Sequence, residues 1–131
     1  MLARYVRATD RRDGAAQGAL FTDDAVVRIV AAGEPVGEPL IGGAGVRWAV
    51  ENLMTPHPEG GASHHVTSDH LVEVDGDRAH LDAQFIVFEV RDGVVRPAES
   101  GHYDTDLLRV DGEWKIVRHD VLLDSPFPRA S

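Results

Sequence analysis

The sequence has 131 residues, enough for one domain that buries roughly two-thirds of its unfolded surface around a single core. Its 22 acidic and 13 basic residues give a formal net charge of −9, and the basic residues are scattered, which argues against nucleic acid and anionic membranes as partners. Cysteine is absent, which excludes disulfides and thiolate catalysis, and no apolar run has the length of a signal peptide or membrane span, so we expect a cytoplasmic protein.

The N-terminal half mixes helical and extended patterns. Leu2, Val6 and Asp10 recur every four residues and predict an amphipathic helix over residues 2–12, in which Asp10 stands on the apolar stripe. Asp13 is placed to cap a second helix. The other elements expected here are this second helix over 15–21, a turn at 22–24, a strand over 25–30, a loop over 32–40, a helix over 41–54 and a loop over 55–61.

The C-terminal half has the alternation of β-strands. Three Asp-Gly pairs, which favour tight hairpin turns, separate the apolar runs. They predict an antiparallel meander with strands over 64–74, 78–91, about 99–110 and 113–122. Helices followed by such a sheet are typical of an α+β domain in which the helices cover one face. We expect one domain over 1–131, with a flexible tail over 124–131.

Several short motifs accompany this order of elements. They are Leu20-Phe21-Thr22-Asp23-Asp24-Ala25, His65 with Asp69 four residues later, Val74-Asp75-Gly76-Asp77, and Tyr103 with Asp111-Gly112-x-Trp114-x-Ile116. With them, nearly the whole chain resembles the SnoaL-like branch of the NTF2-like superfamily. The resemblance implies a cone-shaped α+β fold, with N-terminal helices packed on a curved, mainly antiparallel sheet.

The resemblance also implies site residues. Scytalone dehydratase and the bile-acid 7α-dehydratase in this superfamily pair an Asp near the end of the first helix with a His at the start of the first meander strand. These positions correspond to Asp10 and His65, and a Tyr five residues before the Asp corresponds to Tyr5. Ketosteroid isomerase is similar at Tyr5 and Asp106, but its general base would fall near Ile29, where this chain has no carboxylate.

A His–Asp pair is suited to moving protons near neutral pH. The imidazole acts as the base, and the carboxylate fixes its tautomer and stabilises the imidazolium. Tyr5 would donate to a developing oxyanion. Because successive strand residues point to opposite faces, only one of His64 and His65 can face the cavity, and we favour His65.

Polar side chains alternate along two later strands, with His80, Asp82 and Gln84 on one and His102, Asp104 and Asp106 on the other. These faces either line the cavity or face solvent. If they face inward, His102 and Asp106 become substrate-binding candidates. The residues expected to shape the pocket are Val30, Trp48, Leu53, Phe85 and Phe88.

These features predict a cofactor-free lyase or isomerase, of the dehydratase kind, that acts on a small apolar oxygenated molecule such as a polyketide, steroid or terpenoid. Two alternatives stay open: a non-catalytic ligand-binding or dimerisation module, and a polyketide cyclase that uses Asp106 for an intramolecular aldol closure. No motif has the spacing of metal ligands, so we expect no metal. The resemblance further implies a homo-oligomer, either a dimer, which we favour, or a trimer.

Overall fold

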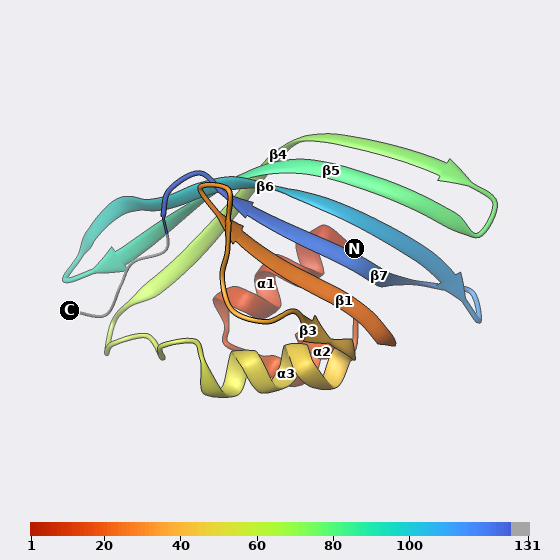
Figure 1. Ribbon diagram of the computed structural model, residues 1–131. Coiled ribbons are helices and arrows are strands. Elements are labelled where there is room, and N and C mark those ends of the chain that lie inside the picture. The colour runs from red at the N-terminus through yellow and green to blue at the C-terminus, as the bar shows by residue number, and fades with distance from the viewer. Residues whose placement is uncertain (127–131) are drawn as a thin grey trace.

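The computed structural model describes residues 1–126, which form helices beneath a curved sheet (Figure 1). In chain order the elements are α1 (Leu2–Asp10), α2 (Gly14–Gly18), β1 (Phe21–Ala31), β2 (Glu34–Pro35), β3 (Leu40–Ile41), α3 (Gly42–Asn52), β4 (Ala62–Asp75), β5 (Arg78–Arg91), β6 (Val94–Val110) and β7 (Glu113–Leu123). Most of the expected tail, residues 127–131, lies outside the described part. Asp124 is held to the sheet, because Ser100 Oγ donates to its carboxylate at 2.6 Å.

The sheet is mixed but mainly antiparallel. Its strand order is β2-β1-β7-β6-β5-β4, with the short β3 also paired to β1. Only the pair β1 and β7 is parallel among the described strands, and β4 forms an edge. The sheet curves over the three helices without closing, and α1 crosses its concave face (Figure 1). This confirms the α+β fold with N-terminal helices on one face of a curved sheet.

Two of the Asp-Gly pairs form the turns expected of them. In the turns at Asp92-Gly93 and Asp111-Gly112, both residues have positive φ, at 52° and 73° in the first and 52° and 80° in the second. This is the backbone of a type I′ turn, whose twist matches that of the flanking strands. Local sequence therefore sets the register of the two long hairpins from β5 to β7.

The first third of the chain departs from the expected boundaries. Helix α1 ends at Asp10 and not at residue 12, and Arg12 has a positive φ of 56°. Asp13 caps α2 as expected, accepting from the Ala16 amide at 3.0 Å. Strand β1 already begins at Phe21, so the predicted turn at 22–24 is wrong. A register shift between Phe21 and Val26 accommodates the acidic residues within the strand.

The core lies between the concave face of the sheet and α1. Its fully buried side chains come from alternate strand positions and from the apolar stripe of the first helix, which is the alternation that the sequence predicts. The buried cluster consists of Leu2, Val6, Phe21, Ala25, Val27, Val46, Leu81, Ala83, Phe85, Tyr103, Leu107 and Ile116. Among residues 1–126, no helix combines the length and the apolar character needed to cross a membrane.

A row of rings crosses the inner face of three adjacent strands. Tyr103 stacks between Phe85 and His119, with ring centroids 4.4 and 5.0 Å away. His119 is fully buried, and its Nδ1 lies 2.7 Å from the Thr105 hydroxyl. Burial, aided by the positive charge of Arg118, lowers the pKa of His119 to about 3, so the ring is neutral. His119 therefore behaves as a core residue.

This burial makes His119 a source of acid sensitivity. Between about pH 6.5 and about pH 3 the unfolded chain binds a proton at this histidine that the folded chain does not, so stability falls as the pH falls. The contribution lost between about pH 7 and about pH 5 is about 2 kcal/mol. Urea unfolding at both pH values should show this loss in the wild type and a smaller one in His119→Phe. Equal losses of stability in the wild type and in His119→Phe would contradict the assignment. The control is His64→Phe, the same change at an exposed histidine.

Candidate functional site

Asp10, the last residue of α1, joins the helix to the start of β4. Its Oδ1 lies 2.5 Å from His65 Nδ1 and accepts from Ser63 Oγ at 3.0 Å. Its Oδ2 accepts from the His65 backbone amide at 3.0 Å. The negative end of a helix disfavours a carboxylate there, and these donors offset that effect. One carboxylate thus holds both a strand backbone and the ring on that strand.

The pair is largely removed from solvent. The side chains of Asp10 and His65 are 17% and 13% exposed. Burial alone would raise the pKa of Asp10, but hydrogen bonds from the ring and backbone of His65 and from Ser63 lower it below its usual value. An ionised Asp10 accepts the Nδ1 hydrogen of His65, which leaves Nε2 with its lone pair. The arrangement is therefore that of a positioned base.

The segment before β4 is fastened to the same end of α1. His57 Nε2 lies 2.7 Å from the Asp10 backbone oxygen. Arg12 donates from Nε to the Thr55 carbonyl at 3.1 Å and from Nη1 to the Thr9 carbonyl at 2.8 Å. These contacts satisfy carbonyls at the helix end and fix the loop beside the dyad.

Two tyrosines that pack together in the core are neutral donors. Tyr5 packs edge-on against Tyr103, with ring centroids 5.6 Å apart. Burial raises the pKa of Tyr5 above its usual range, and burial together with the hydroxyl of Tyr5 and the charge of Asp10 does the same for Tyr103. Both hydroxyls therefore keep their protons. Sequence reasoning identified Tyr5, whereas it named Tyr103 only as part of a motif and gave it no role in the site.

Strand alternation selects the histidine that joins the site. His65 pairs with Val87 across the ladder and lies on the inner face, 6.1 Å between ring centroids from Phe85. His64 is exposed on the outer face. Ser63, which sequence reasoning missed, is two residues before His65 and shares its face. The same alternation rule could have identified it.

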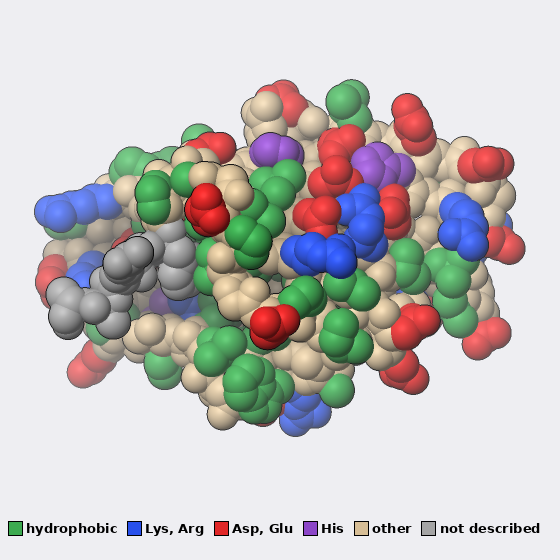
Figure 2. Space-filling view, in the orientation of Figure 1, with side chains coloured by type: hydrophobic (Ala, Val, Ile, Leu, Met, Phe, Trp, Pro, Cys, Tyr) green, Lys and Arg blue, Asp and Glu red, His purple; other side chains and the backbone are tan. Residues whose placement is uncertain are grey.

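The polar strand faces point outward and form an ion network. Asp106 accepts from Arg118 Nε at 2.7 Å and pairs with His80 Nδ1 at 2.7 Å. Figure 2 shows acidic, basic and histidine side chains gathered over these strands. Ligand atoms of His80, Asp82 and Asp104 lie within 4.8 Å of one another, a spacing that could suit a metal ion. Arg118, however, already binds Asp104 at 2.6 Å.

Most residues expected to line the pocket lie elsewhere. His102 and Asp106 share the outer face, because their inward neighbours are Tyr103 and Thr105. We expected both side chains to line the cavity, but strand alternation directs them to the outer face. The same holds for Val30 and Phe88 on the outer face, and for Trp48 and Leu53, which are 54% and 64% exposed. Of the predicted substrate-binding residues, only Phe85 packs against the dyad.

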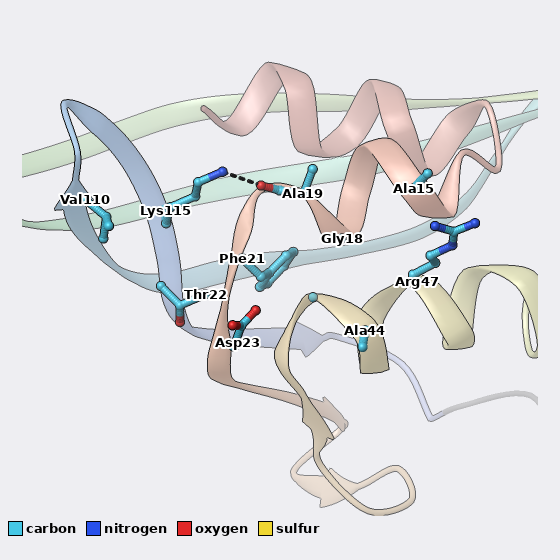
Figure 3. A pocket seen from close by; sticks show the side chains of 11 residues that line it. Ala15, Gly18, Ala19, Phe21, Thr22, Asp23, Ala44, Arg47, Val110 and Lys115 are labelled. Atoms are coloured by element: carbon cyan, nitrogen blue, oxygen red, sulfur yellow. Dashed lines mark hydrogen bonds between the residues drawn. The ribbon is translucent and has the colours of Figure 1, made fainter.

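Two cavities formed by residues within 1–126 lie away from the dyad. One of about 730 Å³ opens between α2, α3 and β1 (Figure 3). Another of about 310 Å³ lies on the sheet above Gly101 and is lined by Gln84 and His102. Neither lining includes Asp10 or His65.

Solved structures with the same fold support this architecture. A variant of Rv3472, a protein of unknown function from Mycobacterium tuberculosis, is 26% identical, with a TM-score of 0.77 over 94% of this chain and 67% of that one. An NTF2-like protein with a cystatin-like fold from Novosphingobium aromaticivorans is 21% identical, with a TM-score of 0.75 over 93% and 76%. A Catenulispora acidiphila protein in complex with S-DNPA is 19% identical, with a TM-score of 0.78 over 93% and 87%.

No curated protein matches the sequence. A family model described as a SnoaL-like domain matches residues 1–120, which is most of the chain and includes both members of the dyad. The chain therefore belongs to the SnoaL-like family.

Proposed function

We propose that the protein is a cofactor-free lyase or isomerase that works by general acid–base catalysis at His65 and Asp10. The observation that carries the proposal is the contact of 2.5 Å between Asp10 Oδ1 and His65 Nδ1, while Oδ2 accepts the amide of the same residue. This double attachment orients the ring and directs Nε2 away from the carboxylate. An oriented imidazole of this kind accelerates proton transfer by roughly 10²- to 10⁴-fold.

The chemistry follows from these roles. His65 Nε2 takes a proton from the carbon next to a carbonyl, and the electron pair of the broken C–H bond moves toward the carbonyl oxygen. The hydroxyl of Tyr5 donates to that oxygen. When the electrons return, a C=C bond forms, the neighbouring C–O bond breaks, and the leaving hydroxyl takes the proton from His65 as water. Return of the proton to another carbon gives isomerisation instead.

The substrate class follows from the surroundings of the dyad. Phe85 and Tyr103 make the inner face beside it apolar, while the tyrosine hydroxyls supply neutral donors. A small apolar oxygenated molecule, such as a polyketide, steroid or terpenoid, matches this chemistry. The complex of the Catenulispora acidiphila protein with S-DNPA indicates that the fold can hold a ligand. The cytoplasmic location expected from the sequence stays a prediction.

A binding module without catalysis is the second candidate. It is favoured by one observation: the cavities of about 730 and 310 Å³ lie away from the dyad. The cyclase alternative has less support, because hydrogen bonding to Arg118 lowers the pKa of Asp106 and makes it a poor proton donor.

The first test removes the dyad. His65→Ala and Asp10→Asn should each lower kcat by roughly 10²- to 10⁴-fold, and the double variant should lose little more, because the two side chains act as one unit. Turnover is measured as loss of water by mass spectrometry on a panel of hydroxylated polyketides and steroids.

The matched control is His64→Ala, which removes the exposed neighbouring imidazole and should keep full activity. Retained turnover in both dyad variants, with loss in Asp106→Asn, would favour the cyclase. If the wild type binds apolar ligands without converting any of them, and does so equally well without His65, the binding module replaces the enzyme.

The tautomer of His65 gives a test that needs no substrate. Ring ¹⁵N chemical shifts should show hydrogen on Nδ1 and a bare Nε2 in the wild type, because the Asp10 carboxylate can only accept. Asp10→Asn should change this distribution, since an amide can also donate. Ser63→Ala removes one donor to Asp10 and should leave the tautomer unchanged. Identical ¹⁵N shifts in wild type and Asp10→Asn would show that no dyad exists.

We also propose a homodimer formed through the outer face of β4 and β5. Val66 and Ile86 are cross-strand partners there and are 52% and 44% exposed, and Leu71 farther along β4 is 70% exposed. Exposed apolar groups clustered on one sheet face are typical of an interface between subunits. A second copy would bury them.

Light scattering after gel filtration should give about twice the mass of one chain for the wild type and the mass of a single chain for the double variant Val66→Lys, Ile86→Lys. Val95→Lys, a similar change on an exposed valine of another hairpin, is the control. A monomeric wild type would contradict the dimer, and a threefold mass would replace it with a trimer.

A further inference from the structure

The cavity of about 730 Å³ between α2 and α3 has a lining of small side chains. Its walls include Ala15, Gly18, Ala19, Gly43 and Ala44, with Phe21 at its inner side. Gly18 and Gly43 approach so closely that a Cβ on either would meet the carbonyl oxygen of the other. The helices therefore touch through their backbones.

The two basic side chains in the lining are already engaged. Lys115 Nζ donates to the Ala19 carbonyl at 2.6 Å, as Figure 3 shows. Arg47 Nε binds Glu51 at 2.6 Å. Because its cations are bound to protein groups, its walls are mostly alanine, glycine, valine and phenylalanine, and Asp23 adds a negative charge to the lining, the cavity suits a neutral apolar molecule better than an anion.

A polar atom without a partner lies in the core, on a ring next to Phe21, which lines the cavity. His119 Nε2 is fully buried and has no hydrogen-bond partner within residues 1–126. Leaving such a group unpaired forfeits its hydrogen bond to water without replacement, and native proteins rarely do so without a reason. A ligand that forms a hydrogen bond with this nitrogen would therefore supply the missing partner.

Hydrogen bonding indicates which tautomer is present. The buried Thr105 hydroxyl lies 2.7 Å from His119 Nδ1. If Thr105 donates to Nδ1, only the Nε2 hydrogen is left unpaired. If Nδ1 donates instead, both the Thr105 hydrogen and the Nε2 lone pair are unpaired, which is the costlier arrangement. His119 thus presents Nε2–H as a neutral donor.

Phe21 stands between this donor and the cavity. Its ring centroid is 6.1 Å from that of His119 and 6.1 Å from that of Tyr5. In Figure 3 the same ring points into the cavity between α2 and β7. The Phe21 side chain thus packs near the His119 ring and also lines the cavity.

We propose that this cavity is a second binding site, separate from the dyad, for a flat apolar molecule with one hydrogen-bond acceptor. When the Phe21 ring rotates away, His119 Nε2–H donates a hydrogen bond to that acceptor. An aromatic ketone has the required chemistry, because its ring fits the apolar walls and its carbonyl oxygen accepts one hydrogen bond. Nothing in this site depends on His65 or Asp10.

The test uses acetophenone as the probe and ethylbenzene as its partner without an acceptor, added to the full chain labelled with ¹⁵N. Both should shift the amide resonances of Ala19 and Ala44, but only acetophenone should shift the His119 Nε2–H proton downfield. His119→Phe should weaken acetophenone binding by about 3- to 10-fold, the ratio for one hydrogen bond, and leave ethylbenzene binding unchanged.

Three variants complete the design. Ala44→Leu narrows the cavity and should weaken both probes. His64→Phe, an equivalent change on the outer face, and Asp10→Asn, which disrupts the dyad, should change neither. The last variant separates this site from the proposed catalytic function, so that either can fail alone.

The opposite result is equally clear in the wild type. The ring centroids of His119 and Tyr5 are 4.6 Å apart, and an N–H directed at the Tyr5 ring should resonate upfield. If the His119 Nε2–H resonance lies upfield and acetophenone does not shift it, the core already satisfies this donor. Probe-induced shifts at Ser63 and His65 in place of Ala19 and Ala44 would likewise overturn the assignment.

Discussion

The carboxylate of Asp10 is the interaction on which the rest of the site depends. It accepts from Ser63, from the His65 amide and from the His65 ring, so one side chain fixes the helix end, the strand backbone and the imidazole together. These are charge-assisted hydrogen bonds in a largely buried position, where they are stronger than in water. The orientation of the His65 ring and the attachment of α1 to β4 therefore have the same physical origin.

The sheet separates two chemistries by strand alternation. Its inner face carries the rings of Phe85, Tyr103 and His119, which pack with α1 into the core. Its outer face carries the network around Arg118, whose carboxylate partners stay partly hydrated. Because neighbouring residues of one strand belong to different faces, polar groups that are adjacent in sequence have unrelated roles.

The two buried histidines differ in the way their polarity is satisfied. His65 has a carboxylate partner at Nδ1, its Nε2 has no hydrogen-bond partner within residues 1–126, and its side chain keeps a small exposed fraction of 13%. His119 has only a hydroxyl partner among the residues that the structure describes, and its burial keeps it neutral. A free lone pair near solvent suits proton transfer, whereas a buried neutral N–H suits binding of an acceptor. This contrast separates the two sites that we propose.

The sequence by itself determined the α+β order of elements and the Asp-Gly turns at residues 92–93 and 111–112, because these follow from local backbone preference. Strand alternation determined that only one of His64 and His65 can face inward. The preference for His65 came from the family resemblance, and the structure places its ring on the inner face. Only the tertiary structure decided that Asp106 and His102 point outward, that Tyr103 lies within the field of Asp10, and that His119 Nε2 has no partner among the described residues. Periodicity shows that two faces exist. Which face the helices cover, and which distant side chains then meet, depends on how the sheet curves and packs.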